Sequence, residues 1–413
     1  MMPLTEKDRN VLRELAKEYM EIAVLPVQKE KKALWQDLNR LHMQRPMLNM
    51  DQIPWHEMDV DGSLKNQVED PYWRNIETGL RRSIYQFRHM PVDMVVQPYI
   101  TLYRPIYCDP FGMQVEKDTA SIDSKSDVFS MHFTNLLENE EDIEKIKPPV
   151  VTLMADAEKE IIQEAEVLFQ GIAPFHMAGI TLHLGIWDSI TQWMGVENCY
   201  IELMDRPEFM HAIMEKCTTN LETVIQQMNR DGLFDCYTNI CHCSYTYLDE
   251  LPTPGCDVDH PKSQDVWAFG LAQLFSSVSP SITAEFEVPY MQRLFPYFGA
   301  IYYGCCDRLD DRLDIVSQMP NIRKISCSPW SDRENFAARL PKQYIMSNKP
   351  NPALVGTDTI DYDEIRRDLR RTIEAARQNG VCLELILKDI STVHYQPQRL
   401  WEWSRIALEE VSR

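Results

Sequence analysis

Several features that would place a protein in a familiar class are missing from this sequence. No run of about 18 apolar residues occurs, so we expect no segment that spans a membrane and no membrane partner. The N-terminus is charged, with a helical pattern, and it lacks the apolar core of a signal peptide. These absences favour a cytoplasmic protein.

Basic residues are also scarce relative to acidic ones. The chain has 42 Lys and Arg against 63 Asp and Glu, which gives a net charge of −21. A charge of this sign disfavours nucleic acid and anionic lipid as partners. It is compatible with a small-molecule substrate or with a partner protein that has a basic face.

Motifs for nucleotides and for structural zinc are absent too. No G-x-G-x-x-G follows an expected strand, and no G-x-x-x-x-G-K-[ST] occurs. None of the 11 cysteines shows C-x-x-C spacing, so no local motif dictates a structural zinc site. An odd number of cysteines in a large chain indicates free thiols in a reducing compartment.

The chain does contain a regular alternation of short apolar runs and amphipathic helical patterns. Eight runs are expected to be strands: 93–100, 172–179, 233–240, 266–275, 299–304, 322–328, 343–348 and 381–387. Eight strands, mostly separated by helices, predict an α/β fold with a (β/α)8 TIM barrel over residues 91–413. Residues 1–90 are expected to form a helical N-terminal extension. A doubly wound open sheet is the alternative.

In such a barrel, the carboxyl ends of the strands converge at one mouth, where the chemistry takes place. The polar and aromatic candidates at these ends are His176, Asn239, His242, Gln273, Tyr303, Cys305, Cys306, Trp330, Lys349, Lys388 and Asp389. The adjacent cysteines stand out, because a thiolate serves as a metal ligand or as a nucleophile. Neighbouring residues of a strand point to opposite faces, so we expect only one of Cys305 and Cys306 to face the mouth. The same reasoning applies to Lys388 and Asp389. Ordinary burial of both thiols is the alternative.

Residues 239–261 form the longest segment between expected strands, and they include His242 and several tyrosines. Long connections in compact domains are usually functional or disordered. We interpret this one as a lid or a substrate-binding loop, with a packed surface excursion as the alternative.

The second half of the chain resembles the uroporphyrinogen decarboxylase superfamily, and within it the corrinoid-dependent methyltransferases more than the true decarboxylases. The resemblance depends on "VSPSITAEFEVPYMQRL" (278–294), "AIYYGCCDRLDDRLDIV" (300–316), "SPWSDRENFAARL" (328–340) and "SNKPNPALV" (347–355). It covers roughly residues 170–410 by the order of elements. It implies a TIM barrel and, in the methyltransferases, a zinc ion held by H-x-C on one strand and a further Cys near the last strand.

This sequence departs from both branches of the superfamily. Only "RPMLNM" (45–50) occurs where the decarboxylases carry arginines that bind substrate carboxylates. The H-x-C positions become Tyr303-Gly304-Cys305 or Gly304-Cys305-Cys306, and the last Cys corresponds to a position near Lys388-Asp389. One thiolate therefore remains, and His242, Glu285, Glu287 or Asp389 would have to replace the other zinc ligands.

From this resemblance we expect an enzyme that moves a methyl group from a small methylated compound to a corrinoid carried by a separate partner protein. The expected zinc ligands are Cys305, Cys306 and His242, and the expected catalytic residues are Tyr303, Lys349 and Asp389. The expected substrate-binding residues are His176, Asn239, Gln273, Trp330 and Lys388. We also expect a homodimer, although nothing in the sequence sets the number of subunits.

Two other functions stay open at this point. The first is a decarboxylase or lyase of the uroporphyrinogen decarboxylase type acting on a small carboxylated substrate, which would need cationic groups in its cavity. The second is a non-catalytic binding protein on the same scaffold, because a fold does not determine a function.

Overall fold

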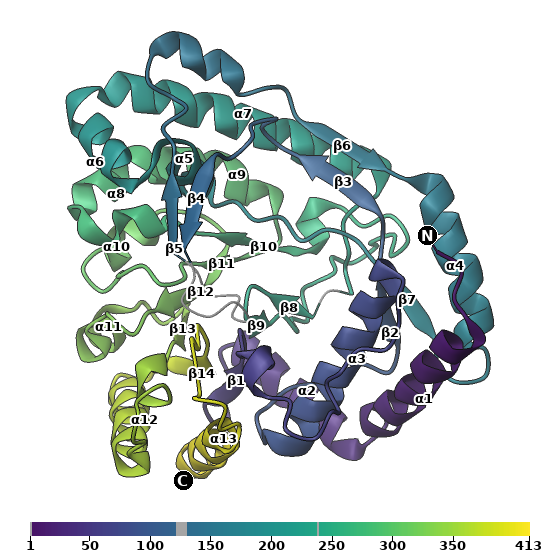
Figure 1. The fold of residues 1–413 in the computed structure, drawn as a ribbon. Helices are drawn as coiled ribbons and strands as arrows, with labels where there is room; N and C mark the ends of the chain where they lie inside the picture. Colours follow the sequence, from purple (N-terminus) through teal and green to yellow (C-terminus); the bar gives the residue numbers. More distant parts are fainter. Residues whose placement is uncertain (1, 121–129, 238) are drawn as a thin grey trace.

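The computed structural model describes residues 2–120, 130–237 and 239–413, and it has a mixed α/β fold (Figure 1). The α-helices are α1 (Glu6–Ala23), α2 (Pro26–Asn39), α3 (Pro71–His89), α4 (Ala155–Phe169), α5 (Ile186–Met194), α6 (Val196–Asp205), α7 (Pro207–Asp231), α8 (Pro280–Phe286), α9 (Val288–Leu294), α10 (Leu313–Val316), α11 (Arg333–Arg339), α12 (Tyr362–Gln378) and α13 (Gln398–Val411). The strands are β1 (Met47–Met50), β2 (Ile100–Tyr103), β3 (Ile106–Asp109), β4 (Lys117–Ala120), β5 (Ser130–Phe133), β6 (Val150–Leu153), β7 (Phe175–Ala178), β8 (Ile240–Cys241), β9 (Ser244–Tyr245), β10 (Trp267–Gly270), β11 (Ala300–Tyr303), β12 (Ile322–Cys327), β13 (Ile345–Asn348) and β14 (Cys382–Leu387).

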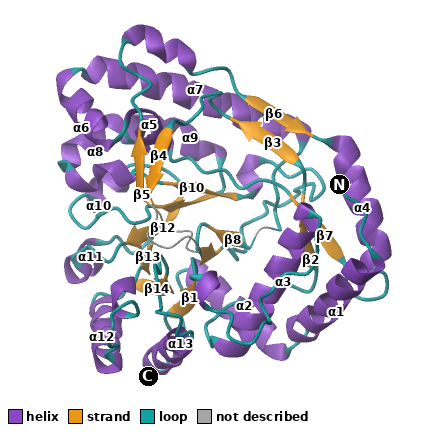
Figure 2. Cartoon of the chain, viewed as in Figure 1, coloured by secondary structure: helices purple, strands orange, loops and turns teal. Residues whose placement is uncertain are grey.

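The central element is a parallel sheet of six strands in the order β1-β14-β13-β12-β11-β10 (Figure 2). Helices separate its consecutive strands, and nearly all of its residues are buried because both faces are covered. The carboxyl ends of these parallel strands lie at the same edge of the sheet. The residues that follow them are therefore neighbours in space.

The closed eight-stranded barrel predicted from the sequence is not formed by the described residues. The six-stranded sheet ends at β1 and β10, and β2 and β7 form a separate parallel pair. A single parallel bridge between His183 and Phe269 continues the sheet beyond β10. The shared features are α/β class, parallel pairing and alternating helices, but the hydrogen-bonded ring is open.

Two predicted strands are irregular because side chains, rather than a neighbouring strand, satisfy their backbone. In the predicted strand 93–100, the Val95 N–H donates to the Tyr245 hydroxyl and the Val96 N–H to Gln28 Oε1, both at 2.9 Å. In the predicted strand 233–240, the Asp235 carboxylate accepts the Tyr237 N–H at 2.9 Å and forms a turn. Side-chain hydrogen bonds of this kind compete with a strand ladder.

The sequence analysis missed β1, which lies inside the segment "RPMLNM". It pairs in parallel with β14, with Met47 opposite Glu384 and Met50 opposite Leu387. The proposed division at residue 90 stays a prediction, but the sheet takes strands from both sides of it. Residues 1–90 therefore contribute a strand as well as helices.

Local sequence signals set several helix ends. Thr5 and Asp8 form a capping box at the start of α1, and Pro26 occupies the first turn of α2. The Asp361 side chain caps α12, and Ile365 and Leu369 are buried on its inner face. The Asp332 side chain caps α11 by accepting from the Asn335 N–H. In the described parts of the chain, no helix combines the length and apolarity needed to cross a bilayer.

Candidate active site

Both cysteines of the adjacent pair face the same cluster, contrary to the prediction that only one would. Strand β11 ends at Tyr303, and Gly304 turns the chain with φ of 87°. This left-handed conformation, which glycine adopts readily, breaks the strand alternation. The sulfurs of Cys305 and Cys306 consequently lie 3.5 Å apart. The Asp307 carboxylate anchors the turn by accepting the Cys305 N–H at 2.7 Å.

The two residues after β14 also point to one place. Lys388 is 1% exposed, and its Nζ donates to the Cys305 sulfur at 3.0 Å. Asp389 has φ of 58°, which turns its carboxylate back toward the site. Its Oδ2 lies 3.2 Å from Lys388 Nζ and 3.1 Å from the Cys306 sulfur. The alternation expected for Lys388 and Asp389 is therefore wrong, for the same reason as for the cysteines.

His242 reaches this cluster from the hairpin of β8 and β9. The residue lies in the hairpin turn with φ of 57°, a strained conformation for a residue with a side chain. Its ring stacks on Phe269 with centroids 4.1 Å apart and an interplanar angle of 7°. Its Nε2 lies 3.3 Å from Lys388 Nζ. The predicted lid or substrate loop is thus an inserted hairpin that supplies a group to the site.

The cluster contains groups with strongly shifted pKa values. The pKa of Cys305 falls to about 3, first because it accepts a hydrogen bond from Cys306 and then because His242 and Lys388 favour its thiolate over the opposing effect of burial. The hydrogen bond to Cys305 is also the main cause of a raised pKa at Cys306. The site therefore pairs a thiolate at Cys305 with a neutral thiol at Cys306.

Burial lowers the pKa of His242, but hydrogen bonds and charge at Cys243 and Cys305 outweigh burial and raise it to about 9. When His242 is protonated, its charge and that of the Lys388 ammonium both favour the Cys305 thiolate. When His242 is neutral, its Nε2 accepts from Lys388. Cys305 is the anion that this pair of cations shares.

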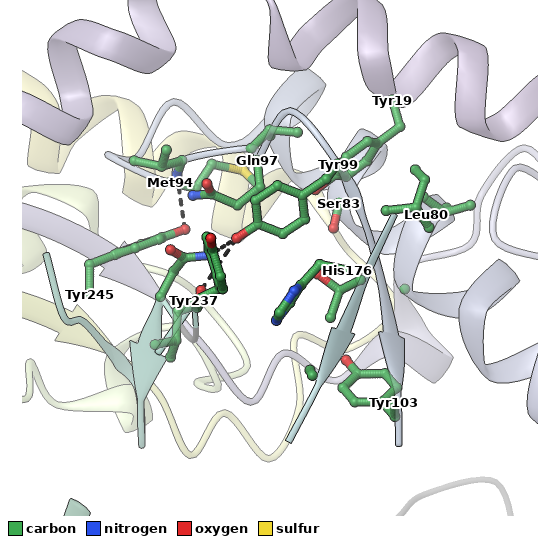
Figure 3. Close-up of a pocket in the computed structure, with 18 of the residues that line it drawn as sticks. Tyr19, Leu80, Ser83, Met94, Gln97, Tyr99, Tyr103, His176, Tyr237 and Tyr245 are labelled. Atoms are coloured by element: carbon green, nitrogen blue, oxygen red, sulfur yellow. Dashed lines mark hydrogen bonds between the residues drawn. The ribbon is translucent and has the colours of Figure 1, made fainter. Parts of the chain in front are cut away.

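A cavity of about 600 Å³ opens beside His242, a size typical of small-molecule sites (Figure 3). Its walls come from α1, α3, residues 94–103, β7 and the segment 235–245. One face of α3 lines it with Asn75, Gly79 and Ser83, which recur at helical spacing. The sequence analysis missed this wall, although small and polar residues on one face of an otherwise amphipathic helix were a readable signal.

His176 and Asn239, both predicted to bind substrate, line this cavity. The His176 Nε2 lies 2.7 Å from the Asp235 carboxylate, which is buried and so orients the ring. Asn239 donates to the Tyr99 hydroxyl at 3.1 Å. The rings of Tyr99, His176 and Tyr237 contact one another with centroids 4.6 to 6.4 Å apart.

The lining combines aromatic surface with acidic rather than basic groups. Five tyrosines contribute to it: Tyr19, Tyr99, Tyr103, Tyr237 and Tyr245. Asp51 and Asp235 are its carboxylates, and burial raises the pKa of Asp51. Among the described residues that line the cavity, none is Lys or Arg. Such a lining favours a neutral or cationic ligand, because the described residues offer a substrate carboxylate no lysine or arginine.

Tyr303 and Lys349, predicted to be catalytic, lie away from this cavity. Tyr303 is fully buried, and its hydroxyl donates to Glu287 at 3.3 Å. Lys349 is also buried, and it donates to the Ser347 hydroxyl at 2.7 Å. Both side chains are part of the interior of the sheet. Their catalytic roles stay predictions, and the function proposed for the cavity does not depend on them.

Gln273 and Trp330, predicted to bind substrate, are also separate from the cavity lining. Trp330 is 69% exposed, and Gln273 begins a short 3-10 helix after β10. Neither residue is among the described residues that line the cavity.

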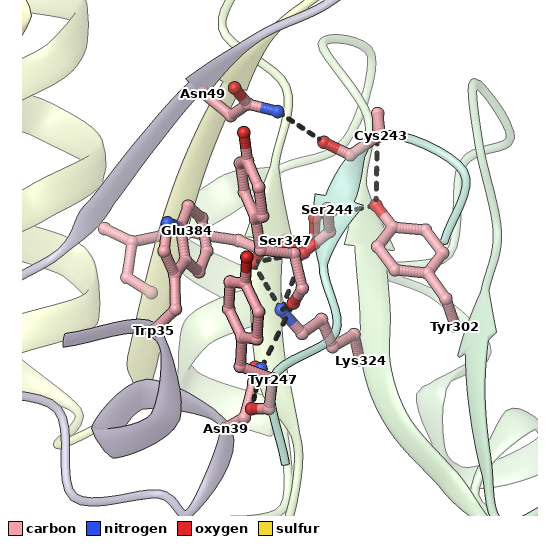
Figure 4. A network of polar contacts seen from close by, with 12 residues as sticks. Trp35, Asn39, Asn49, Cys243, Ser244, Tyr247, Tyr302, Lys324, Ser347 and Glu384 are labelled. Atoms are coloured by element: carbon pink, nitrogen blue, oxygen red, sulfur yellow. Dashed lines mark hydrogen bonds and ion pairs between the residues drawn. The ribbon is translucent and has the colours of Figure 1, made fainter. Parts of the chain in front are cut away.

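A polar network inside the concave face of the sheet supports the hairpin that carries His242 (Figure 4). Lys324 Nζ on β12 lies 2.8 Å from Glu384 Oε2 on β14, and both side chains are fully buried. Ser244 of the hairpin donates to the same Glu384 oxygen at 2.7 Å and accepts from Lys324 at 2.6 Å. The buried ion pair thus fixes the position of β9, two residues after His242.

The donor set was tested against the zinc ion that the resemblance implies. Zinc binds Cys sulfur at about 2.3 Å and His nitrogen at about 2.0 Å, with several ligands converging on one point. Here the Lys388 ammonium occupies the space among Cys305, His242 and Asp389. In the part of the chain that the structure describes, no three His, Cys, Asp or Glu side chains are arranged to hold a metal. The donors around Lys388 therefore do not fit a zinc ion.

Comparison with known proteins adds information about the fold. No family model and no curated protein sequence matches the chain. Among solved structures, a methyltransferase from Methanosarcina mazei is similar with a TM-score of 0.50 and 10% sequence identity, over 92% of this chain and 98% of that chain. At this identity the similarity concerns the fold alone. It extends over nearly the full length of both chains.

Proposed function

We propose that this protein is a methyltransferase that moves a methyl group from a small methylated compound to the cobalt of a corrinoid carried by a separate protein. The observation that carries the proposal is the position of His242 at the wall of a ligand-sized cavity, where hydrogen bonds and charge at Cys243 and Cys305 raise the pKa of its ring to about 9. The methyltransferase from Methanosarcina mazei, similar in fold over most of both chains, supports the same class of reaction. The resemblance of residues 278–355 to the uroporphyrinogen decarboxylase superfamily agrees with it.

The reaction needs an acid that improves the leaving group. Cobalt supplies an electron pair to the methyl carbon, and the bond between that carbon and a heteroatom breaks. The heteroatom keeps the bonding electrons and takes a proton from the His242 imidazolium. Positioned acids of this kind contribute about 10²–10⁴-fold to a rate. After the transfer, the neutral ring stays beside the Lys388 ammonium, which favours the neutral form.

The cavity also indicates the class of methyl donor. Tyrosine rings stack on aromatic groups and attract alkylammonium groups, whereas a carboxylate would meet Asp51 and Asp235 without a lysine or arginine in the described lining. We therefore propose aryl methyl ethers and methylated amines without a carboxylate as donors. The decarboxylase alternative requires cationic groups around the substrate, and no observation favours it.

The test is a spectroscopic assay of methyl transfer to reduced free cobalamin, used as the acceptor in place of the partner protein. The donor panel contains methoxyaryl compounds, methylamines and methylthio compounds, each beside a carboxylated analogue. We expect methylcobalamin to form from uncharged or cationic donors faster than from their carboxylated analogues. Formation of decarboxylated product without methylcobalamin would refute the proposal.

The variant His242→Gln tests the acid directly. It should lower the rate by about 10²-fold or more with an aryl methyl ether, whose leaving oxygen needs a proton. The loss should be much smaller with a tetramethylammonium donor, because a tertiary amine leaves without taking a proton. Lys159→Ala, on the exposed face of α4, is the control and should match the wild type. An equal loss with both donors would assign His242 a structural role.

A further inference from the structure

The buried Lys388 ammonium lies beside the Cys305 sulfur and the Asp389 carboxylate, two groups that a cation stabilises. It extends from the end of β14 into the space between the cysteine turn (residues 304–306) and the hairpin that carries His242. Its side chain is 1% exposed. A buried ammonium group is costly unless anions and hydrogen-bond acceptors surround it.

Three groups of different chemistry surround the nitrogen at nearly equal distances. The Cys305 sulfur lies at 3.0 Å, the Asp389 carboxylate oxygen at 3.2 Å and the His242 Nε2 at 3.3 Å. An ammonium group has three N–H donors, of which Cys305 and Asp389 accept two, and His242 Nε2 accepts the third when its ring is neutral. Sulfur, imidazole and carboxylate are also the donor types that zinc selects.

We propose that the Lys388 ammonium is the resident cation of this site and holds Cys305, His242 and Asp389 around itself, where the resemblance to the methyltransferases implies a metal ion. Its use in catalysis rests on the proposed methyl transfer, but the arrangement itself does not. The ammonium balances the Cys305 thiolate and keeps the His242 ring at the cavity wall. Lys388 is in this sense a positioning residue, since the described cavity lining does not include it.

The proposal explains how the site differs from a metal centre built with the same donors. Contacts of 3.0 to 3.3 Å are hydrogen-bond lengths, about 1 Å longer than bonds to zinc. A metal ion and the Lys388 nitrogen cannot occupy the same point. Removing the lysine head group would leave a thiolate, an imidazole and a carboxylate around an empty space of suitable chemistry.

The experiment measures zinc directly, without a methyl donor or acceptor. Wild type, Lys388→Ala, Lys388→Met and the control Lys159→Ala are purified without chelator, dialysed against zinc and analysed for bound metal. We expect no stoichiometric zinc in the wild type or in the control, and a gain of one zinc ion per chain in Lys388→Ala. A wild type that retains one zinc ion per chain, lost on Cys305→Ser, would overturn the proposal.

A second readout remains usable if Lys388→Ala fails to fold, as judged by circular dichroism. Iodoacetamide alkylation of Cys305 at neutral pH is followed by peptide mass spectrometry. Lys388→Met should slow alkylation of Cys305, and Lys388→Arg should restore it, because arginine returns the charge. Unchanged alkylation in a folded Lys388→Met would refute the role of the ammonium. Both readouts are independent of methyl transfer, so failure of the proposed function would leave them interpretable.

Discussion

Cys305 and His242 influence each other through charge, and this coupling sets the pH range of the site. The Cys305 thiolate is one cause of the raised pKa of His242, which reaches about 9. In turn, the hydrogen bond from Cys306 and the charges of His242 and Lys388 hold the pKa of Cys305 at about 3. The thiolate is therefore a positioning group in the proposed mechanism, whereas the imidazolium transfers the proton.

The variant Cys305→Ser should shift the pH profile of methyl transfer. Activity that needs protonated His242 is present below the pKa of about 9 and is lost as pH rises through it. Without the thiolate, the pKa of His242 should fall toward its ordinary value of about 6.5. The alkaline loss of kcat/KM should therefore move to lower pH. A lower rate with an unmoved profile would contradict the coupling.

The opposite pKa shifts of His242 and Cys305 also affect how the stability of the folded state depends on pH. The raised pKa of His242 stabilises the folded state below about pH 6.5, and this contribution is lost as pH rises to about 9. The lowered pKa of Cys305 contributes fully above its unfolded pKa of about 8.5, and this contribution is lost as pH falls toward 3. Between these two unfolded values the slopes have opposite signs and largely cancel.

Among the elements, the hairpin of β8 and β9 depends most on a buried charge. Lys324 and Glu384 connect β12 to β14 across β13, and Ser244 joins them from β9. The Lys324 ammonium also lies over the rings of Trp35 and Trp267, at 5.3 and 5.9 Å. The ion pair therefore determines where the hairpin, and with it His242, can lie.

Replacing one partner of the Lys324–Glu384 pair should lower the free energy of unfolding much more than replacing both. Lys324→Met leaves a buried carboxylate without its cation, which typically destabilises a protein by about 3–5 kcal/mol. The double variant Lys324→Met, Glu384→Leu should recover most of that loss, since a hydrophobic pair of similar volume is often neutral. Denaturant unfolding of both variants measures the difference. A double variant as unstable as the single one would contradict this account.

The sequence predicted elements better than their pairing. The apolar runs at β7, β10, β11, β12, β13 and β14 and the caps of α1 and α12 were readable, because burial and capping leave local patterns. The strands missed or wrongly assigned depend on distant partners, such as Tyr245 and Gln28, which take the backbone N–H groups of Val95 and Val96. No local pattern contains that information.

Most residues of the site could be predicted from the sequence, but the directions of their side chains could not. Alternation along a strand implied one inward residue from each adjacent pair, whereas positive φ angles at Gly304 and Asp389 bring in all four. His176, Asn239 and the cysteine turn were identified from strand ends. The cavity wall formed by α3 was not predicted, because residues 1–90 were expected to form only a helical extension of the barrel.

For the whole molecule, the N-terminal part should be indispensable. A chain of residues 91–413 lacks β1, which pairs with β14, and α3, which forms one wall of the cavity. The exposed edge of β14 would be free to pair with other chains. We expect this fragment to aggregate or to lack cooperative unfolding, as measured by light scattering and circular dichroism. A soluble fragment that unfolds cooperatively would support a domain boundary at residue 90 instead.

The pairing of β1 with β14 also has a consequence for synthesis on the ribosome. Synthesis runs from the N-terminal side, so β1 must wait until β14 has been made before its neighbour in the sheet is available. Cys305 and Cys306 emerge before Lys388, and a nascent chain halted after Cys306 but before Lys388 carries two adjacent thiols without the ammonium that later contacts Cys305. This dithiol therefore stays without its cation until the residue after β14 has been added.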